Sequence, residues 1–203
     1  RVLESDEAVE HIRCRYRSLV SMCDRNLGRI LDLMDEHDLW RDTMLIVGTD
    51  HGFLLGEHGW WAKNQMRYYN EVANNPLFIW DPRSGVKGER RQALVQMIDW
   101  APTLYDFFQQ PVPPDVQGQP LAKTVSHDEP VRSAAMFGVF SGHVNVTDGR
   151  YVYMRAALPG REDDIVNYTL MPIKMNSRYP VDEMRTLSLA PPFRFTKGLQ
   201  VLR

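Results

Sequence analysis

The stretch Met44-Leu45-Ile46-Val47-Gly48-Thr49-Asp50-His51-Gly52 decides the fold class, because an apolar run passes directly into a polar turn. The continuous apolar residues Met44–Val47 predict a strand that is covered on both faces. A similar run at Pro76–Trp80 closes in turn residues and predicts a second strand. Ala93–Ile98 predicts a third strand. These runs together indicate a sheet.

Helices are expected on both sides of these strands. Ser5 precedes two acidic residues, which is typical of a helix N-terminus. Apolar residues then recur at spacings of three and four as far as about His37, which predicts one long helix. Asp99 is placed to cap a short helix that runs through Phe108, with Pro102 in its first turn. A helix, strands and another helix in this order predict an α/β layered sheet with flanking helices.

The character of the chain changes beyond Gln109, where prolines mark a loop. Three later runs have the composition of antiparallel strands: Ala134–Phe140, Val144–Thr147 and Tyr151–Arg155. Asp148-Gly149 predicts a two-residue hairpin turn between the last two. We therefore expect an α/β domain over residues 1–122 and a small antiparallel subdomain with an irregular tail over residues 123–203.

Composition excludes several classes of protein. The 203 residues are 43% apolar and 25% charged, which is ordinary for a globular domain with a core. The net charge of −2 gives no basic field for nucleic acid, and no apolar run approaches the about 18 residues of a membrane span. The sequence names no compartment; a soluble protein of the bacterial cytoplasm or periplasm is the expectation. The sequons at Asn145 and Asn167 would be used only in a protein secreted by a eukaryote.

The residues best suited to chemistry lie between Asp50 and Lys63. In the turn after a strand, Asp50 and His51 can direct a carboxylate oxygen and an imidazole nitrogen at one cation. Open α/β sheets bind ligands at this edge, and a lysine such as Lys63 suits sulfate or phosphate. Gly52 and Gly56 permit the tight backbone path. The alternative is an ordinary polar turn followed by a solvated lysine.

Aromatic residues flank Lys63 on both sides: Trp60, Trp61, Tyr68 and Tyr69. Two interpretations remain open for them. They form the wall of a substrate pocket, or they cover the edge of the sheet.

Several segments in this order resemble the sulfatase family, which belongs to the alkaline-phosphatase-like superfamily. The segments are Thr49-Asp50-His51-Gly52, Leu55-Gly56-Glu57-His58-Gly59 with Lys63, Asn75–Trp80, and Asp99-Trp100-Ala101-Pro102-Thr103-Leu104. The first two resemble the family's metal and substrate segment. In the loop Gln117–Leu121, Pro120 replaces the family's usual serine. The resemblance covers residues 5 to 122 and implies part of an alkaline-phosphatase-like sheet.

The resemblance also implies roles. Asp50 and His51 match metal ligands for Ca²⁺, Mg²⁺ or Mn²⁺, and an imidazole ligand favours Mn²⁺ or a similar metal. Lys63 matches the lysine that holds sulfate or phosphate oxygens, and His58 matches a catalytic-pocket histidine. Many arylsulfatases carry Asp-Asn where this chain has Asp50-His51, and the histidine version occurs in phosphonate monoester hydrolases. A small-molecule sulfate ester is therefore the expected substrate, with phosphonate monoesters or phosphodiesters as the alternative.

One part of the family's machinery does not match. These enzymes attack with a formylglycine made from the Cys or Ser of a Cys/Ser-x-Pro/Ala-x-Arg motif, and neither Cys14 nor Cys23 stands in such a motif. We expect the chain to be the C-terminal part of a longer enzyme whose N-terminal part supplies the formylglycine. By itself the chain should be inactive and, with an exposed sheet edge, prone to self-association. A non-catalytic binding module on the same fold is the alternative of another class.

Overall fold

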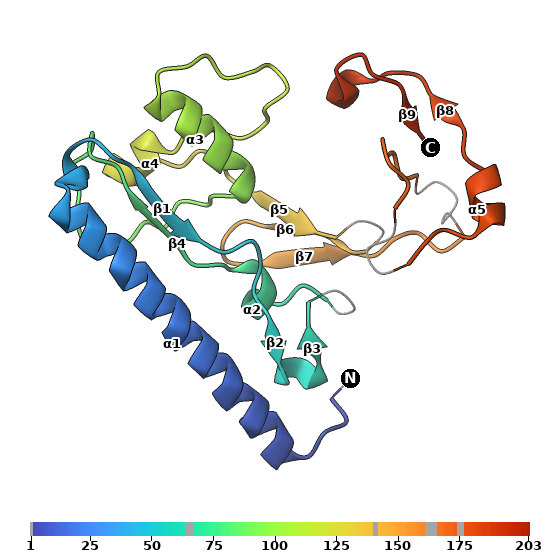
Figure 1. Ribbon diagram of the computed structural model, residues 1–203, viewed down its shortest axis with the longest axis horizontal. Coiled ribbons are helices and arrows are strands. Elements are labelled where there is room, and N and C mark those ends of the chain that lie inside the picture. Colours follow the sequence, from blue (N-terminus) through green and yellow to red (C-terminus); the bar gives the residue numbers. More distant parts are fainter. Residues whose placement is uncertain (1, 64–66, 140–141, 161–165, 174–176) are drawn as a thin grey trace. The chain divides into compact units, whose positions relative to one another are not determined.

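The computed structural model describes residues 2–63, 67–139, 142–160, 166–173 and 177–203 (Figure 1). Its helices and strands are short except for the first helix. The α-helices are α1 (Asp6–Glu36), α2 (Asn70–Ala73), α3 (Trp100–Phe107), α4 (Ala122–His127) and α5 (Val181–Arg185). The strands are β1 (Leu45–Gly48), β2 (Leu54–Leu55), β3 (Trp61–Ala62), β4 (Leu77–Trp80), β5 (Ala135–Gly138), β6 (Val144–Thr147), β7 (Val152–Arg155), β8 (Leu189–Ala190) and β9 (Val201–Leu202). Single 3₁₀ turns occupy Leu39–Arg41, Glu57–Gly59, Met97–Asp99 and Arg194–Thr196.

The chain forms two compact units. The first comprises Arg1–Val112 and Val116–Arg155, and the second comprises Pro113–Asp115 and Ala156–Arg203. All the candidate site residues fall in the first unit. The division after residue 122, expected from the sequence, stays a prediction.

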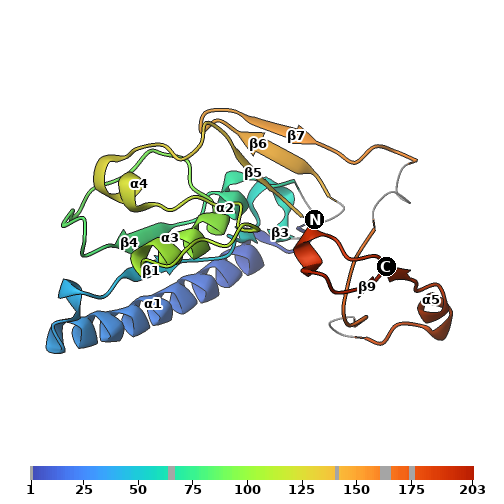
Figure 2. The ribbon, with the colours of Figure 1, turned by 90° about the horizontal axis from the view of Figure 1, so that it is seen from above.

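Helix α1 begins and ends as the sequence predicts. The Ser5 hydroxyl accepts a hydrogen bond from the Ala8 N–H at 3.3 Å, and the His37 N–H closes the last turn on the Leu33 carbonyl at 3.1 Å. In both Figures 1 and 2 the helix lies along the β1–β4 pair, and its Met34 side chain is buried. Neither α1 nor any other helix in the described ranges is long and apolar enough to cross a membrane.

Strands β1 and β4 confirm the first two predicted strands. They pair antiparallel, from Leu45 opposite Trp80 to Gly48 opposite Leu77. In β1 the side chains of Leu45, Ile46 and Val47 are all partly buried, whereas Phe78 of β4 is 67% exposed. An antiparallel pair tolerates one open face. The polar turn begins where β1 ends, at Gly48, as predicted.

The prediction of a third strand at Ala93–Ile98 is wrong. Side chains rather than a neighbouring strand bind its backbone: the Ala93 N–H donates to the Asp128 carboxylate at 3.0 Å, and the Gln96 N–H donates to Asp99 at 2.7 Å. A 3₁₀ turn then takes Met97–Asp99. An apolar run cannot form a strand when carboxylates occupy the N–H groups of its ladder.

Asp99 differs from its predicted role as the cap of α3. The helix does start at Trp100 with Pro102 in its first turn, but the Asp99 side chain accepts no hydrogen bond as its N-cap. Instead the Asp99 carboxylate is fully buried and accepts hydrogen bonds from both terminal nitrogens of Arg132. It also accepts from the Gln119 N–H at 2.9 Å and from the Gln96 N–H. Burial by itself raises the pKa of Asp99, but these donors outweigh it and the pKa is lowered.

Strands β5, β6 and β7 form the predicted antiparallel sheet. Phe140, included in the first predicted strand, lies outside the described residues. The β6–β7 turn is longer than the predicted two residues, since Thr147 pairs with Val152 and the Asp148 carboxylate accepts the Arg150 and Tyr151 N–H groups at 2.9 and 2.7 Å.

One polar side chain of this sheet is fully buried. Asn145 lies on β6 opposite Phe137, and its Nδ2 donates to the Phe137 carbonyl at 3.1 Å. Its side chain is therefore part of the pairing between β5 and β6.

Candidate active site

The turn after β1 fixes the orientation of His51. The Nδ1 of His51 lies 2.9 Å from the Gly52 carbonyl oxygen, and the His51 N–H donates to Asp50 Oδ1 at 3.0 Å. A carbonyl oxygen can only accept, so Nδ1 carries the proton. The lone pair of the neutral ring is consequently on Nε2. Ligating histidines commonly have this arrangement, with the other ring N–H held by a carbonyl or carboxylate.

Lys63 joins this turn from the end of β3. Its Nζ is hydrogen-bonded to His51 Nε2, and the same Nε2 lies 3.1 Å from Asp50 Oδ2. The structure therefore brings together Asp50, His51 and Lys63. Burial of Asp50 acts to raise its pKa, but the neighbouring His51 side chain, the His51 N–H and the Lys63 ammonium lower it overall. The Asp50 side chain remains 70% exposed, so water and ligands reach it.

Gly52 is required by a close backbone approach. Its N–H donates to the Val72 carbonyl at 2.9 Å, and a Cβ at this position would lie 1.7 Å from the Glu71 carbonyl oxygen. Only glycine fits here. Helix α2, which contains Glu71 and Val72, thus supports the turn that carries Asp50 and His51.

The loop that carries His58 is fixed to the start of α1. Arg13 donates through Nε to the Leu55 carbonyl at 2.9 Å, and Trp61 donates through Nε1 to Glu4 at 2.8 Å. Gly56 has φ +99°, a conformation that glycine adopts readily. Arg13 was not among the residues predicted for the site. Its signal was a charged residue on the packed stripe of an amphipathic helix.

His58 is held by Glu71 and Tyr69 and not by the turn that carries Asp50. Its Nε2 lies 3.1 Å from Glu71 Oε1, and its ring stacks on Tyr69 with centroids 3.8 Å apart. Hydrogen bonds from the backbone N–H of Glu71 and then from His58 outweigh desolvation and lower the pKa of Glu71. Over the described ranges no hydrogen bond or ion pair links His58 to Asp50, His51 or Lys63. Its catalytic role stays a prediction.

The aromatic residues near Lys63 cover a small apolar core. Leu54 and Val72 are fully buried, and Trp60, Tyr68 and Tyr69 pack against them. Burial raises the pKa of the Tyr68 hydroxyl. These three aromatics therefore contact this small core, and both roles expected for them, pocket wall and cover of the sheet edge, stay predictions.

Asp50 and His51 can supply only part of a metal's ligand set. No group of three or more His, Cys, Asp or Glu side chains suited to a metal occurs within the part of the chain that the structure describes. Hard divalent cations take about six or more ligands. The carboxylate and the Nε2 lone pair fit Mn²⁺ or Mg²⁺ chemically, provided that further ligands come from elsewhere.

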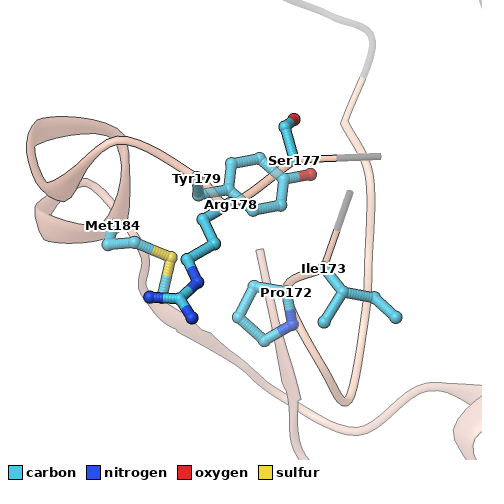
Figure 3. A pocket seen from close by; sticks show the side chains of 6 residues that line it. All are labelled: Pro172, Ile173, Ser177, Arg178, Tyr179 and Met184. Atoms are coloured by element: carbon cyan, nitrogen blue, oxygen red, sulfur yellow. The ribbon is translucent and has the colours of Figure 1, made fainter. Parts of the chain in front are cut away.

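A hollow in the second unit offers different chemistry (Figure 3). It has a volume of about 270 Å³ and is lined by Pro172, Ile173, Ser177, Arg178, Tyr179 and Met184. Arg178 is the charged group of this lining and there is no carboxylate or imidazole among these six residues. The hollow therefore provides apolar contact and a guanidinium, but no metal ligand of the usual kinds.

Comparison with known proteins places these residues in a family. A family model described as Sulfatase matches residues 3–110. An N-acetylglucosamine-6-O-sulfatase of Bacteroides thetaiotaomicron is 34% identical over 113 residues, which are 56% of this chain and 20% of that protein.

Two solved structures extend the likeness. BT4656, solved with its substrate D-glucosamine-2-N,6-O-disulfate, is 29% identical with a TM-score of 0.56 over 64% of this chain and 28% of that one. The phosphonate monoester hydrolase SpPMH from Silicibacter pomeroyi shares the fold, with a TM-score of 0.69 and 24% identity over 76% of this chain and 34% of that one. The chain thus spans 20 to 34% of the lengths of these three relatives.

Proposed function

Because the chain belongs to the sulfatase family and has the alkaline-phosphatase-like fold, we propose that it supplies part of the active site of a metal-dependent hydrolase that cleaves sulfate esters. The observation that supports this most directly is the convergence of Asp50, His51 and Lys63 at the end of β1. A carboxylate, an imidazole lone pair and an ammonium meet there on an exposed turn. That combination suits a cation and an oxyanion side by side.

The roles follow from the atoms that each side chain presents. Asp50 and His51 Nε2 would hold the cation, which when bound supplies positive charge for a polarised oxygen. Lys63 brings three N–H donors and a positive charge that neutralise charge developing on the transferred sulfuryl group. Gly52 and α2 keep the turn in place. The nucleophile would come from outside this chain, since no cysteine or serine of the chain stands in a formylglycine motif.

Sulfated sugars are the first substrates to test. One relative is named for N-acetylglucosamine 6-O-sulfate, and BT4656 was solved with a disulfated glucosamine. His51 favours a second candidate activity, the hydrolysis of phosphonate monoesters or phosphodiesters, because the resemblance places histidine at this position in such enzymes. A non-catalytic binding module on this fold remains the alternative of another class.

The metal assignment is tested by Asp50→Ala and His51→Ala in the full-length protein. Each variant should lose metal content and activity together, because each removes a ligand. His11→Ala and Asp32→Ala, which change exposed residues of α1, serve as matched controls that should retain both. Full metal occupancy in both site variants would contradict the assignment.

The substrate assignment needs matched esters. Turnover of an aryl sulfate well above that of the corresponding aryl phosphonate by the full-length protein supports sulfate-ester hydrolysis, and the reverse ratio supports the second candidate. Binding of sulfated sugars without turnover of either ester supports the binding module. The 203-residue chain by itself should hydrolyse none of these esters, because it lacks an activated nucleophile.

A further inference from the structure

His51 Nε2 has two polar neighbours, the Lys63 ammonium and the Asp50 carboxylate. Nδ1–H is committed to the Gly52 carbonyl at 2.9 Å, so the neutral ring can only accept at Nε2. Lys63 Nζ donates into that position. Asp50 Oδ2 lies 3.1 Å from the same nitrogen and offers it no proton while ionised. The Lys63 ammonium thus occupies the imidazole lone pair, and Asp50 lies beside the same nitrogen; His51 and Asp50 are the two groups assigned to the metal.

We propose that Lys63 and a divalent cation bind to His51 Nε2 in alternation, so that metal binding displaces the Lys63 ammonium and makes it available to the oxyanion of the substrate. The proposal rests on the proposed function, because it takes Asp50 and His51 as the ligands. It adds a coupling between metal binding and substrate recognition that the individual roles do not contain. Only coordination and hydrogen bonds change; no covalent step is involved.

Electrostatics and side-chain flexibility make the exchange feasible. A metal ion on the Nε2 lone pair and an ammonium hydrogen-bonded to the same atom exclude one another sterically, and two cations a few ångströms apart repel even in water. Lysine has a flexible four-carbon stem, so the ammonium can move without movement of the backbone. Asp50 is 70% exposed, which leaves room on its side of the turn.

The exchange predicts effects of opposite sign for one side chain. Removal of the Lys63 charge should strengthen metal binding, because the competitor is lost, and should weaken catalysis, because the contact with the oxyanion is lost. A lysine that only supports the turn would weaken metal binding when removed, since His51 would lose a positioning contact. A solvated lysine would change neither quantity.

The experiment measures Mn²⁺ binding to the metal-stripped full-length protein by calorimetry, without substrate. Lys63→Met should lower the Kd for Mn²⁺ by about tenfold. Lys63→Arg, which retains the charge, should stay close to the wild type. Lys87→Met is the matched control: Lys87 lies over the Trp80 ring at 5.8 Å, away from the turn, and its loss should leave the Kd unchanged. If Lys63→Met does not fold by circular dichroism, Lys63→Gln replaces it.

Two outcomes overturn the proposal, and they differ from failure of the proposed function. An unchanged or raised Kd in Lys63→Met, or an equal decrease in Lys87→Met, refutes the exchange. If Mn²⁺ binding is nevertheless lost in Asp50→Ala and His51→Ala, the metal site itself stands. If Mn²⁺ binding depends on neither Asp50 nor His51, the proposed function fails and the exchange fails with it.

Discussion

Two clusters of charged side chains in the first unit are built around an aspartate, but one is buried and the other is exposed. Asp99 is fully buried, and its carboxylate is shared by Arg132 and two backbone N–H groups. Asp50 is 70% exposed, and it shares one imidazole nitrogen with Lys63. In the first cluster every strong donor has an acceptor nearby. In the second, His51 Nε2 accepts a hydrogen bond from Lys63 and also lies close to the Asp50 carboxylate.

The difference separates a structural ion pair from the candidate active site. A buried, saturated pair has nothing left to bind, and its loss exposes an uncompensated charge to the protein interior. An exposed, under-supplied cluster contributes little to stability but can exchange its partners for a ligand. Mutations in the Asp99 cluster should therefore lower the stability of the fold, whereas mutations in the Asp50 cluster should lower ligand binding and activity.

The largest effect is expected for Asp99→Ala. It leaves the Arg132 guanidinium, whose side chain is 13% exposed, without its partner. We expect the free energy of unfolding to fall by about 3–5 kcal/mol. Urea denaturation of the purified protein measures it. A loss no larger than that of Arg17→Ala, which breaks an exposed ion pair with Glu10, would remove the distinction between the two clusters.

The second prediction concerns Lys63→Ala in the full-length protein. Loss of a charge-assisted contact to the transferred group should cost about 2–4 kcal/mol of transition-state stabilisation, which is about one and a half to three decades in kcat/KM. The urea midpoint should not change, because the side chain supports no buried pair. Steady-state kinetics and denaturation together test this, with Lys87→Ala as the control. Unaltered kinetics would make Lys63 an ordinary solvated lysine.

The third prediction uses pH. The pKa of Asp99 is lowered in the folded protein, so its ionisation stabilises the fold above the usual aspartate pKa of about 4. This contribution should be lost as the pH falls through the lowered pKa. The stability difference between the wild type and Asp99→Asn should therefore be constant at neutral pH and shrink below about pH 4. A difference that does not vary with pH would show that the charge of Asp99 is not what stabilises the fold.

The smallest effect is expected for Asp50→Asn. Its carboxylate is exposed and accepts few hydrogen bonds, so thermal unfolding without added metal should match the wild type. With Mn²⁺ added, only the wild type should gain stability, because binding to the native state raises the unfolding temperature. Loss of stability without metal would place Asp50 with Asp99 as a structural residue.

Local patterns predicted most of the first unit. The Ser5 cap, the three- and four-residue spacing of α1 and the apolar runs of β1 and β4 act within a few residues, so the sequence reveals them directly. The failed strand at Ala93–Ile98 was decided from outside the run, by Asp128, which lies 35 residues away from Ala93. Such long-range hydrogen bonds have no local signal.

The candidate site was predictable to a similar extent. The polar turn at the end of β1 indicated Asp50 and His51, and the structure brings Lys63 to them. The orientation of His58 could not be derived from the sequence. It depends on contacts with Glu71 and Tyr69, which belong to α2 and its N-cap and lie more than ten residues further along the chain. The position of Arg13 on the packed face of α1 was a local signal, but its partner, the Leu55 carbonyl 42 residues away, has none.

The burial of Asn145 has a consequence for the host in which the protein is made. A eukaryotic secretory pathway attaches N-glycans to the amide nitrogen of Asn-x-Thr sequons, and in Asn145 this is the atom that donates to the Phe137 carbonyl. A chain glycosylated there could not pair β5 with β6, because the side chain is fully enclosed. The exposed Asn167 sequon imposes no such obstacle. Bacterial expression avoids this competition between glycosylation and folding.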